Sequence, residues 1–368
     1  DAGAHIIGIK DMAGLCKPEA ARRLVKALKE ETGLPVHFHT HDTSGASAAS
    51  VLAAVDAGVD AVDAAIDSMS GLTSQPNLGA IVEALRHGKR DTGLDPVAIR
   101  KISTYWEQVR TLYTAFEADF KSGASEVYSH EIPGGQYTNL RQQARSMGID
   151  HRWPEVADTY AKVNEMFGDV IKVTPTSKVV GDLALMMITG NLTPAEIQDP
   201  EREIAFPDSV ISFFRGDVGQ PYGGFPKALQ KKVLKDKKPL TKRPGAVMKP
   251  TDLKATRTEA EHKVGRHISD AELASYLMYP QVFVEYAQHR RTYSDVHKVP
   301  TRAFFYGMDA GDEMTIELEK GRGLVVRFLA LGEVDEHGMR TVFFELNGQP
   351  RSVRIEDRAS GVETVKNR

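Results

Sequence analysis

Hydrophobic and polar positions follow two periods in the first part of the chain. Short, β-branched apolar runs at 5–10, 35–41 and 59–67 predict three buried strands. Between them, 18–33 has apolar positions spaced as on one helix face, and 46–58 is an alanine-rich helical segment. A strand–helix alternation at this spacing predicts βαβ units that form a parallel sheet.

A weak internal sequence repeat, called an echo here, supports the same architecture. DAGAHIIGIKDMAG (1–14) and DAGVDAVDAAIDSMSG (56–71) both place Asp-Ala-Gly before a strand, and an aspartate with a small-residue loop after it. Such an echo is typical of the repeated units of a (β/α)8 barrel. The sequence therefore predicts the last three β/α units of a TIM barrel at 1–92. Residue 1 is expected to follow a helix that belongs to a longer chain.

The periodicity becomes helical and rich in aromatic residues after this segment. A helical extension over the barrel mouth is predicted at 93–290, interrupted near 227–250 by a basic, proline-bearing linker. The charge of that linker is most simply a solvated surface, and the alternative is a patch for phosphate or a partner. Helices are expected at 97–120, 136–147, 153–167, 179–190, 194–199 and 269–288.

The C-terminal part alternates at period two. Residues 291–358 predict a small antiparallel β module, with turns at Lys320-Gly321 and Asn347-Gly348, and 359–368 resembles a linker. The predicted fold class is α/β: the C-terminal part of a (β/α)8 barrel, a helical funnel-like extension and a β-rich accessory domain.

Composition narrows the class of protein. Hydrophobic residues make up 41% and charged residues 26%, as in ordinary globular domains, and a net charge of -3 argues against nucleic-acid or anionic-membrane partners. No apolar run approaches the roughly 18 residues of a membrane span, and no signal peptide opens the chain. The single Cys16 indicates a reducing compartment, either bacterial cytoplasm or mitochondrial matrix, and is expected to be an inert thiol.

Three histidines lie at alternate positions of the second predicted strand. His37, His39 and His41 share one face of that strand, and His39 and His41 lie nearest the barrel mouth. Two imidazoles in this arrangement can bind one divalent cation, and zinc, manganese and cobalt all suit such ligands. His37, about 7 Å deeper at 3.3 Å per residue, is expected to support the site through a hydrogen bond. The alternative is three core histidines satisfied by hydrogen bonds.

Lys10 ends the preceding strand and is expected at the same rim. An ammonium beside a metal ion would be repelled, so Lys10 is predicted to be either a low-pKa amine or an amine modified to an anion. A carbamate formed with CO2 would turn it into a carboxylate-like ligand. The alternative is an ordinary lysine that extends to solvent at the end of a strand.

A longer set of motifs resembles one family. The segments GIKDMAGL, PVHFHTHDTSG, DAAIDSMSGLTSQPN, GGQYTNL, VTPTSKVVGDLA, FFYGMDAGDE and VFFELNGQPR resemble the carboxyltransferase portion of the pyruvate carboxylase family. The resemblance covers essentially the whole chain. The His-x-His pair alone is shared by many metal-dependent barrels, whereas TPTSK and the C-terminal module narrow the resemblance to this family.

The resemblance implies roles for individual residues. His39 and His41 match the family's metal ligands, and Lys10 matches its carbamylated lysine. Thr174 matches the threonine that carries a proton between biotin and pyruvate. Residues that match positions of the biotin pocket are Gln136, Ser177 and Lys178. A fourth metal ligand, an aspartate, and the side chains that hold pyruvate would precede residue 1.

The resemblance also implies an activity and its partners. The expected enzyme is a biotin-dependent ligase whose carboxyltransferase domain moves CO2 from carboxybiotin to pyruvate and forms oxaloacetate, which serves anaplerosis and gluconeogenesis. Expected cofactors are Zn²⁺ or Mn²⁺, biotin on a carrier domain outside the chain, ATP used by another domain, and acetyl-CoA as an allosteric activator. A homotetramer is expected, with a dimer possible for this portion. The alternatives are an oxaloacetate decarboxylase or transcarboxylase subunit, and a non-enzymatic assembly scaffold.

Overall fold

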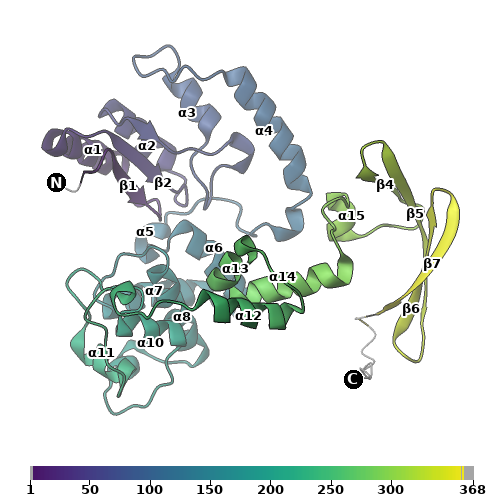
Figure 1. The fold of residues 1–368 in the computed structure, drawn as a ribbon. Helices are drawn as coiled ribbons and strands as arrows, with labels where there is room; N and C mark the ends of the chain where they lie inside the picture. The colour runs from purple at the N-terminus through teal and green to yellow at the C-terminus, as the bar shows by residue number, and fades with distance from the viewer. Residues whose placement is uncertain (1–2, 358, 360–368) are drawn as a thin grey trace. The chain divides into compact units, whose positions relative to one another are not determined.

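The computed structural model describes residues 3–357 and residue 359. The chain divides into two compact units, Asp1–Met248 and Lys249–Arg368, which are described separately below (Figure 1). The linker expected at 359–368, apart from residue 359, and the helix end expected at residue 1 lie outside the described residues.

The first unit begins with alternating strands and helices. Its first elements are β1 (Ile7–Asp11), α1 (Pro18–Thr32), β2 (Val36–Thr40), α2 (Ser47–Asp56), β3 (Ala61–Val62), the 3-10 helix η1 (Asp67–Met69) and α3 (Leu78–Leu85). The strands form one parallel sheet in the order β1-β2-β3. The parallel βαβ winding predicted from the sequence is therefore confirmed.

The boundaries of α1 follow from its terminal residues. Pro18 occupies the first helical turn, where its missing N–H costs no hydrogen bond. Gly33 ends the helix with φ 65°, and its N–H donates to Lys29 O. Both predicted ends of this helix are confirmed. By contrast, β3 is much shorter than the predicted strand 59–67, and beyond it only Ala65 forms a bridge, to Asn77.

The sheet has one apolar face and one polar face. Val36 and Phe38 of β2 are fully buried, and they pack with Val25 of α1 and Val51 of α2 in one core cluster. Figure 1 shows α1 and α2 beside the strands. Alternate residues of a strand point to opposite sides, so the histidines of β2 lie on the face that these helices leave uncovered.

A helical region completes the first unit. Its elements are α4 (Pro96–Thr111), η2 (Thr114–Phe116), α5 (Val127–His130), α6 (Gly134–Ser146), η3 (Asp150–Arg152), α7 (Trp153–Met166), α8 (Thr176–Thr189), α9 (Pro194–Gln198), α10 (Asp208–Arg215), α11 (Lys227–Leu234) and η4 (Pro244–Ala246). A second core cluster joins α6 to α11, and its largest buried side chains include Tyr160, Phe167, Phe213 and Phe214.

The segment expected to be a basic linker begins with a helix. In α11, Leu229, Val233 and Leu234 are buried, whereas Lys227 and Lys231 are exposed, as on the two faces of an amphipathic helix. Lys232 is held by the C-terminal end of α9, where its Nζ donates to Ile197 O at 2.7 Å. That lysine therefore has a structural role, because a cation stabilises the free carbonyls at the end of a helix.

His130, at the end of α5, gives the first unit a pH-dependent stability. Its imidazole is 5% exposed, and Nδ1 accepts the Ile132 N–H at 3.0 Å, so the neutral form carries its proton on Nε2. Burial lowers the pKa of His130 from 6.5 to about 4, against a smaller opposing effect of Glu131. Protonation would both charge a buried ring and replace the acceptor at Nδ1 by a donor.

We expect the free energy of unfolding to fall as the pH drops from 6.5 towards about 4, because the unfolded chain then binds a proton that the folded state excludes. One such group contributes a slope of at most about 1.4 kcal/mol per pH unit. His130→Gln keeps an acceptor and should lose this component. Urea unfolding of both proteins at several pH values in this range measures it, and equal pH dependence in both would contradict the prediction.

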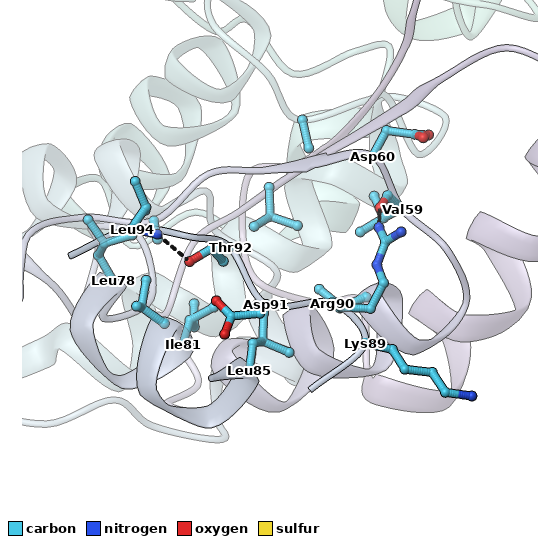
Figure 2. Close-up of a pocket in the computed structure, with 15 residues that line it drawn as sticks. Val59, Asp60, Leu78, Ile81, Leu85, Lys89, Arg90, Asp91, Thr92 and Leu94 are labelled. Carbon is cyan, nitrogen blue, oxygen red and sulfur yellow. Dashed lines mark hydrogen bonds between the residues drawn. The ribbon is translucent and has the colours of Figure 1, made fainter. Parts of the chain in front are cut away.

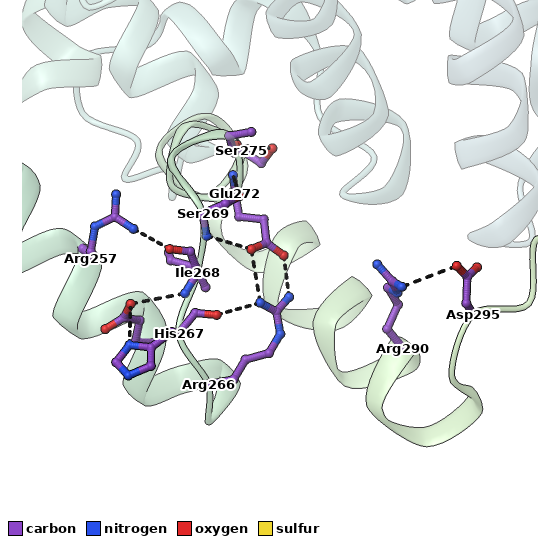
Figure 3. Close-up of polar contacts among 11 residues, drawn as sticks. Arg257, Arg266, His267, Ile268, Ser269, Glu272, Ser275, Arg290 and Asp295 are labelled. Carbon is purple, nitrogen blue, oxygen red and sulfur yellow. Dashed lines mark hydrogen bonds and ion pairs between the residues drawn. The ribbon is translucent and has the colours of Figure 1, made fainter.

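The second unit starts with a small helical cluster. Its helices are α12 (Leu253–Val264), α13 (Asp270–Met278), α14 (Pro280–Tyr293) and α15 (Thr301–Tyr306). Ser269 and Glu272 form a capping box at the start of α13. Arg266 also pairs with Glu272, with Nη1 3.1 Å from Oε2 (Figure 3). These hydrogen bonds, led by that of Arg266, lower the pKa of Glu272 to about 2.

An antiparallel sheet follows in the same unit. Its strands are β4 (Glu313–Glu319), β5 (Arg322–Val334), β6 (Met339–Leu346) and β7 (Gln349–Glu356), in the order β4-β5-β6-β7. Tight turns join β4 to β5 at 320–321 and β6 to β7 at 347–348, as predicted. The predicted antiparallel sheet is therefore confirmed, although it begins only at Glu313, and α15 occupies part of the β module predicted at 291–358.

Candidate active site

The histidines gather where the parallel strands end. His37 and His39 lie within β2, and His41 follows one residue after the strand. The Nε2 atoms of His39 and His41 are 3.3 Å apart, and their rings meet edge to face. The two imidazoles that the sequence singled out as a pair are thus brought together at the C-terminal edge of the sheet.

Hydrogen bonds at the other ring nitrogen fix both tautomers. His39 Nδ1 lies 2.7 Å from Asp63 Oδ2, and His41 Nδ1 lies 2.6 Å from the carbonyl oxygen of Thr73. A carbonyl, like an ionised carboxylate, can only accept, so each Nδ1 carries the proton. When both rings are neutral, the Nε2 atoms therefore present lone pairs toward each other. Two acceptors this close fit a shared cation, because without one they repel.

Asp63 connects the first two histidines. It follows β3, and its Oδ1 lies 2.8 Å from His37 Nε2 while Oδ2 bonds to His39. Burial acts to raise the pKa of Asp63, but the hydrogen bonds from His37 and His39 outweigh it, so the pKa lies below its ordinary value. An ionised carboxylate behind a histidine orients the ring for metal binding. Sequence reasoning missed Asp63, because the strand predicted at 59–67 placed it in the middle, whereas the strand of the structure ends at Val62.

Lys10 lies in register with His39 on the neighbouring strand. Residues paired in a parallel sheet point to the same face, so the lysine and the imidazole share the polar face. Burial lowers the pKa of His41, and the charges of His39 and Lys10 lower it further, while its bond to Thr73 opposes the shift. Within 3–357 and 359, no group of three His, Cys, Asp or Glu side chains could hold a metal. Of the predicted metal ligands, the structure brings the two imidazoles into contact and places Lys10 on the neighbouring strand, opposite His39.

Hydrogen bonds to side chains hold the loops that follow β1 and β2, at the rim where the parallel strands end. Asp11 accepts the N–H groups of Leu15 and Cys16 and the hydroxyl of Thr40, at 2.8–2.9 Å. Asp42 accepts the N–H of Ser47, the first residue of α2, at 3.0 Å. Burial and the charge of Asp11 raise the pKa of Cys16 to about 11, so this cysteine stays a protonated thiol at neutral pH.

The candidate proton carrier lies in the turn before α8. Thr174 is exposed, and Ser177 on the first turn of α8 is buried. Lys178 is exposed and forms an ion pair with Asp182, one helical turn later. Gln136 on α6 is 9% exposed, and its Nε2 has no hydrogen-bond partner among the described residues.

Gln136 and Lys178 line one shallow cavity. The cavity measures about 370 Å³, and its other walls are Asn139, Gln142, Gln143 and Ser146 of α6. Amide and hydroxyl groups can both donate and accept, so this surface suits a polar, uncharged group such as a urea or an amide.

Two further hollows lie near the parallel strands. One, of about 520 Å³, is lined by the loop 69–74 and by aromatic side chains that include Trp106, Tyr113 and Phe120. It therefore adjoins Thr73, the partner of His41. The other, of about 430 Å³, lies at the N-terminal end of β3 between Val59, Asp60 and α3 (Figure 2). Because barrel active sites lie at the C-terminal ends of strands, this second hollow is not the site.

Comparison with known proteins fits this geometry. Residues 127–327, more than half of the chain, match the family described as conserved carboxylase domain. The chain belongs to the conserved carboxylase domain family. Residues 1–105, which carry the histidines and Lys10, match the HMGL-like family.

Two relatives match almost the whole chain. Pyruvate carboxylase of Bacillus subtilis is 48% identical over 97% of the chain, and pyruvate carboxylase 1 of Caenorhabditis elegans is 49% identical over 99%. The chain spans about a third of each relative, 31% of its length.

Solved structures extend the comparison to the fold. The carboxyl transferase domain of Rhizobium etli pyruvate carboxylase, solved with pyruvate and biocytin, is 60% identical and superposes with a TM-score of 0.92. The match covers 97% of this chain and 60% of that one. The predicted resemblance and the α/β fold, with barrel units first and an antiparallel sheet last, are confirmed. No helix in the described part of the chain has the length and apolar character needed to cross a membrane.

Proposed function

We propose that this chain performs the carboxyl-transfer half-reaction of a biotin-dependent pyruvate carboxylase, in which CO2 passes from carboxybiotin to pyruvate and oxaloacetate forms. The observation that carries the proposal is the pair of Nε2 atoms of His39 and His41, 3.3 Å apart with both lone pairs free for a cation. The 60% identity to a carboxyl transferase domain solved with pyruvate and biocytin supports the same assignment.

The donor set fits a divalent ion, for which we propose Zn²⁺ or Mn²⁺. His39 and His41 would supply two nitrogen ligands. Lys10 would supply an oxygen ligand after its Nζ adds to CO2 and loses a proton, which gives a carbamate anion. When bound, the ion polarises a carbonyl oxygen and so eases loss of a proton from the neighbouring carbon.

Thr174 is proposed as the group that holds and passes the proton. Its hydroxyl is exposed just before α8, and a hydroxyl can accept one proton while it gives up another. We assign the amide-lined cavity of Gln136 and Lys178 to the biotin ring, and the buried Ser177 precedes Lys178 on α8. Biotin supplies the activated carboxyl group, and the chain supplies position and polarity.

The remaining parts of the reaction are proposed for other portions of the complete protein. ATP-dependent carboxylation of biotin and the biotin carrier domain belong there, since the chain spans 31% of its relatives. We further propose a homotetramer, acetyl-CoA as an activator, and a role in anaplerosis and gluconeogenesis, in the bacterial cytoplasm or the mitochondrial matrix. Relatives named pyruvate carboxylase match the chain over its β module as well, which favours this assignment over the decarboxylase and transcarboxylase alternatives.

The proposal is tested on the full-length protein. We expect oxaloacetate to form when ATP, bicarbonate and pyruvate are all present, and the rate to fall to background when any one is omitted. Malate dehydrogenase and NADH report oxaloacetate directly. ATP cleavage that depends on biotin but yields no oxaloacetate from pyruvate would contradict the proposed acceptor.

A further inference from the structure

The charged side chain of Lys172, two residues before Thr174, is largely removed from solvent. Its side chain is 12% exposed, and its Nζ lies 2.7 Å from Glu131 Oε2 and 3.9 Å from Asp169 Oδ1. The pair with Glu131 joins segments that are 41 residues apart in sequence. An ammonium removed from water in this way needs its partners, whereas an exposed ion pair contributes little.

Both partners of Lys172 have an unusual backbone. Glu131 has φ 54° and Asp169 has φ 53°, the left-handed region that residues with a Cβ rarely adopt. Glutamate has no special preference for this conformation. At Glu131 the turn ends α5, and its N–H bonds to Val127 O at 2.7 Å. Strain of this kind persists only where the surroundings impose it, and at Glu131 it accompanies the ion pair with Lys172, whereas the closer partner of Asp169 Oδ1 is Asn164 Nδ2, at 2.7 Å.

The turn that carries Thr174 is fixed on its other side as well. The Thr176 hydroxyl lies 2.6 Å from Ile171 O, also contacts Val173 O, and accepts the Val173 N–H at 3.2 Å. Thr174 therefore lies between two anchored residues, Lys172 and Thr176. Thr174 itself is an exposed residue.

The segment that holds Lys172 is bonded to the histidine rim. Gly134 N–H, at the start of α6, donates to Met12 O at 2.8 Å, and Ala124 N–H donates to Thr43 O at 2.9 Å. A Cβ added at Gly134 would lie 2.7 Å from His41 Nδ1, so this backbone touches the imidazole itself. Residues 124–134 thus connect the rim to Glu131.

We propose that Lys172 is a positioning residue, whose ion pair with Glu131 sets the distance between the Thr174 hydroxyl and the His39–His41 pair. The connecting contacts run from His41 to the backbone of Gly134, along the chain to Glu131, and through the ion pair to Lys172. This inference rests on the proposed function of Thr174. Proton transfer needs donor and acceptor in hydrogen-bond contact, and a displacement of about 1 Å can cost about 100-fold in rate.

The test uses the full-length protein and two uncharged variants, Lys172→Met and Glu131→Gln. We expect kcat for carboxyl transfer to fall about 10- to 100-fold in both. The KM for pyruvate, the metal content and the ATP-cleaving half-reaction should stay within about two-fold of the unaltered protein. Lys172→Arg should keep most of kcat, because it retains the charge. The matched control is Lys162→Met on α7, where Lys162 is half exposed and pairs only locally with Asp158.

Each outcome either supports or overturns the positioning role of Lys172. A kcat within about two-fold of normal in Glu131→Gln would overturn the proposal, and so would a kcat loss that metal loss or a lowered melting temperature accounts for in both variants. If Lys172→Met fails to fold, Glu131→Gln alone decides, since it preserves size and shape. A protein without carboxyl transfer before any substitution contradicts the proposed function instead, so the two failures are distinguishable.

Discussion

Replacing Thr174 by alanine should reduce carboxyl transfer by about 100- to 10,000-fold, the usual contribution of a positioned proton-transfer group. Thr174 is exposed, and its neighbours Lys172 and Thr176 hold the turn through their own side chains. The alanine variant should therefore keep the fold and the turn, and lose only the hydroxyl. The measurement is kcat for oxaloacetate formation by the full-length protein.

The control for this substitution is Thr174→Ser. Serine keeps the hydroxyl and should retain a kcat within about ten-fold of the unaltered protein, since the proton path stays intact. Metal content and ATP cleavage should be unchanged in both variants. A Thr174→Ala protein with near-normal transfer would remove this residue from the mechanism.

Removing either rim imidazole should eliminate the bound metal, with transfer lost in parallel. His39→Ala and His41→Ala each delete one of the two nitrogen ligands that we propose, which face each other at 3.3 Å. We expect the metal content per protein to fall to about a tenth or less after dialysis. Removing only a hydrogen-bond partner of a ligand already costs about 10- to 100-fold in metal affinity, and removing the ligand itself should cost at least as much. Elemental analysis of the full-length variants measures this.

His37 provides the matched control on the same strand. It lies two residues from His39 and shares Asp63, but its Nε2 bonds to that carboxylate and takes no part in the pair. His37→Gln should therefore keep a full complement of metal at saturation. Metal retained by His39→Ala but lost by His37→Gln would reverse the assignment of the ligands.

Local chemistry explains which elements could be predicted. Period-two alternation identified β2, and Pro18 with Gly33 marked both ends of α1, because proline and glycine act through their own backbone. In contrast, β3 ends after Val62 although apolar residues continue to Ile66, since pairing with β2 stops there. The many lysines of α11 favoured a linker in the prediction, although this segment is an amphipathic helix whose apolar side chains are buried.

The candidate site was predictable only in part, for a similar reason. His39 and His41 are two residues apart, so strand geometry alone places them together. Asp63 and the Lys172–Glu131 pair join segments that are 24 and 41 residues apart in sequence. Such contacts follow from cross-strand register and helix packing, which periodicity does not specify.

Anomalous X-ray diffraction from crystals of the metal-loaded, full-length protein tests the metal centre most directly. Data collected on both sides of the metal's absorption edge should place one strong peak within about 2.0–2.2 Å of Nε2 of both His39 and His41, with density for a carbamate on Lys10 reaching the same ion. A fully loaded protein whose anomalous peak lies away from these two nitrogens would contradict the account.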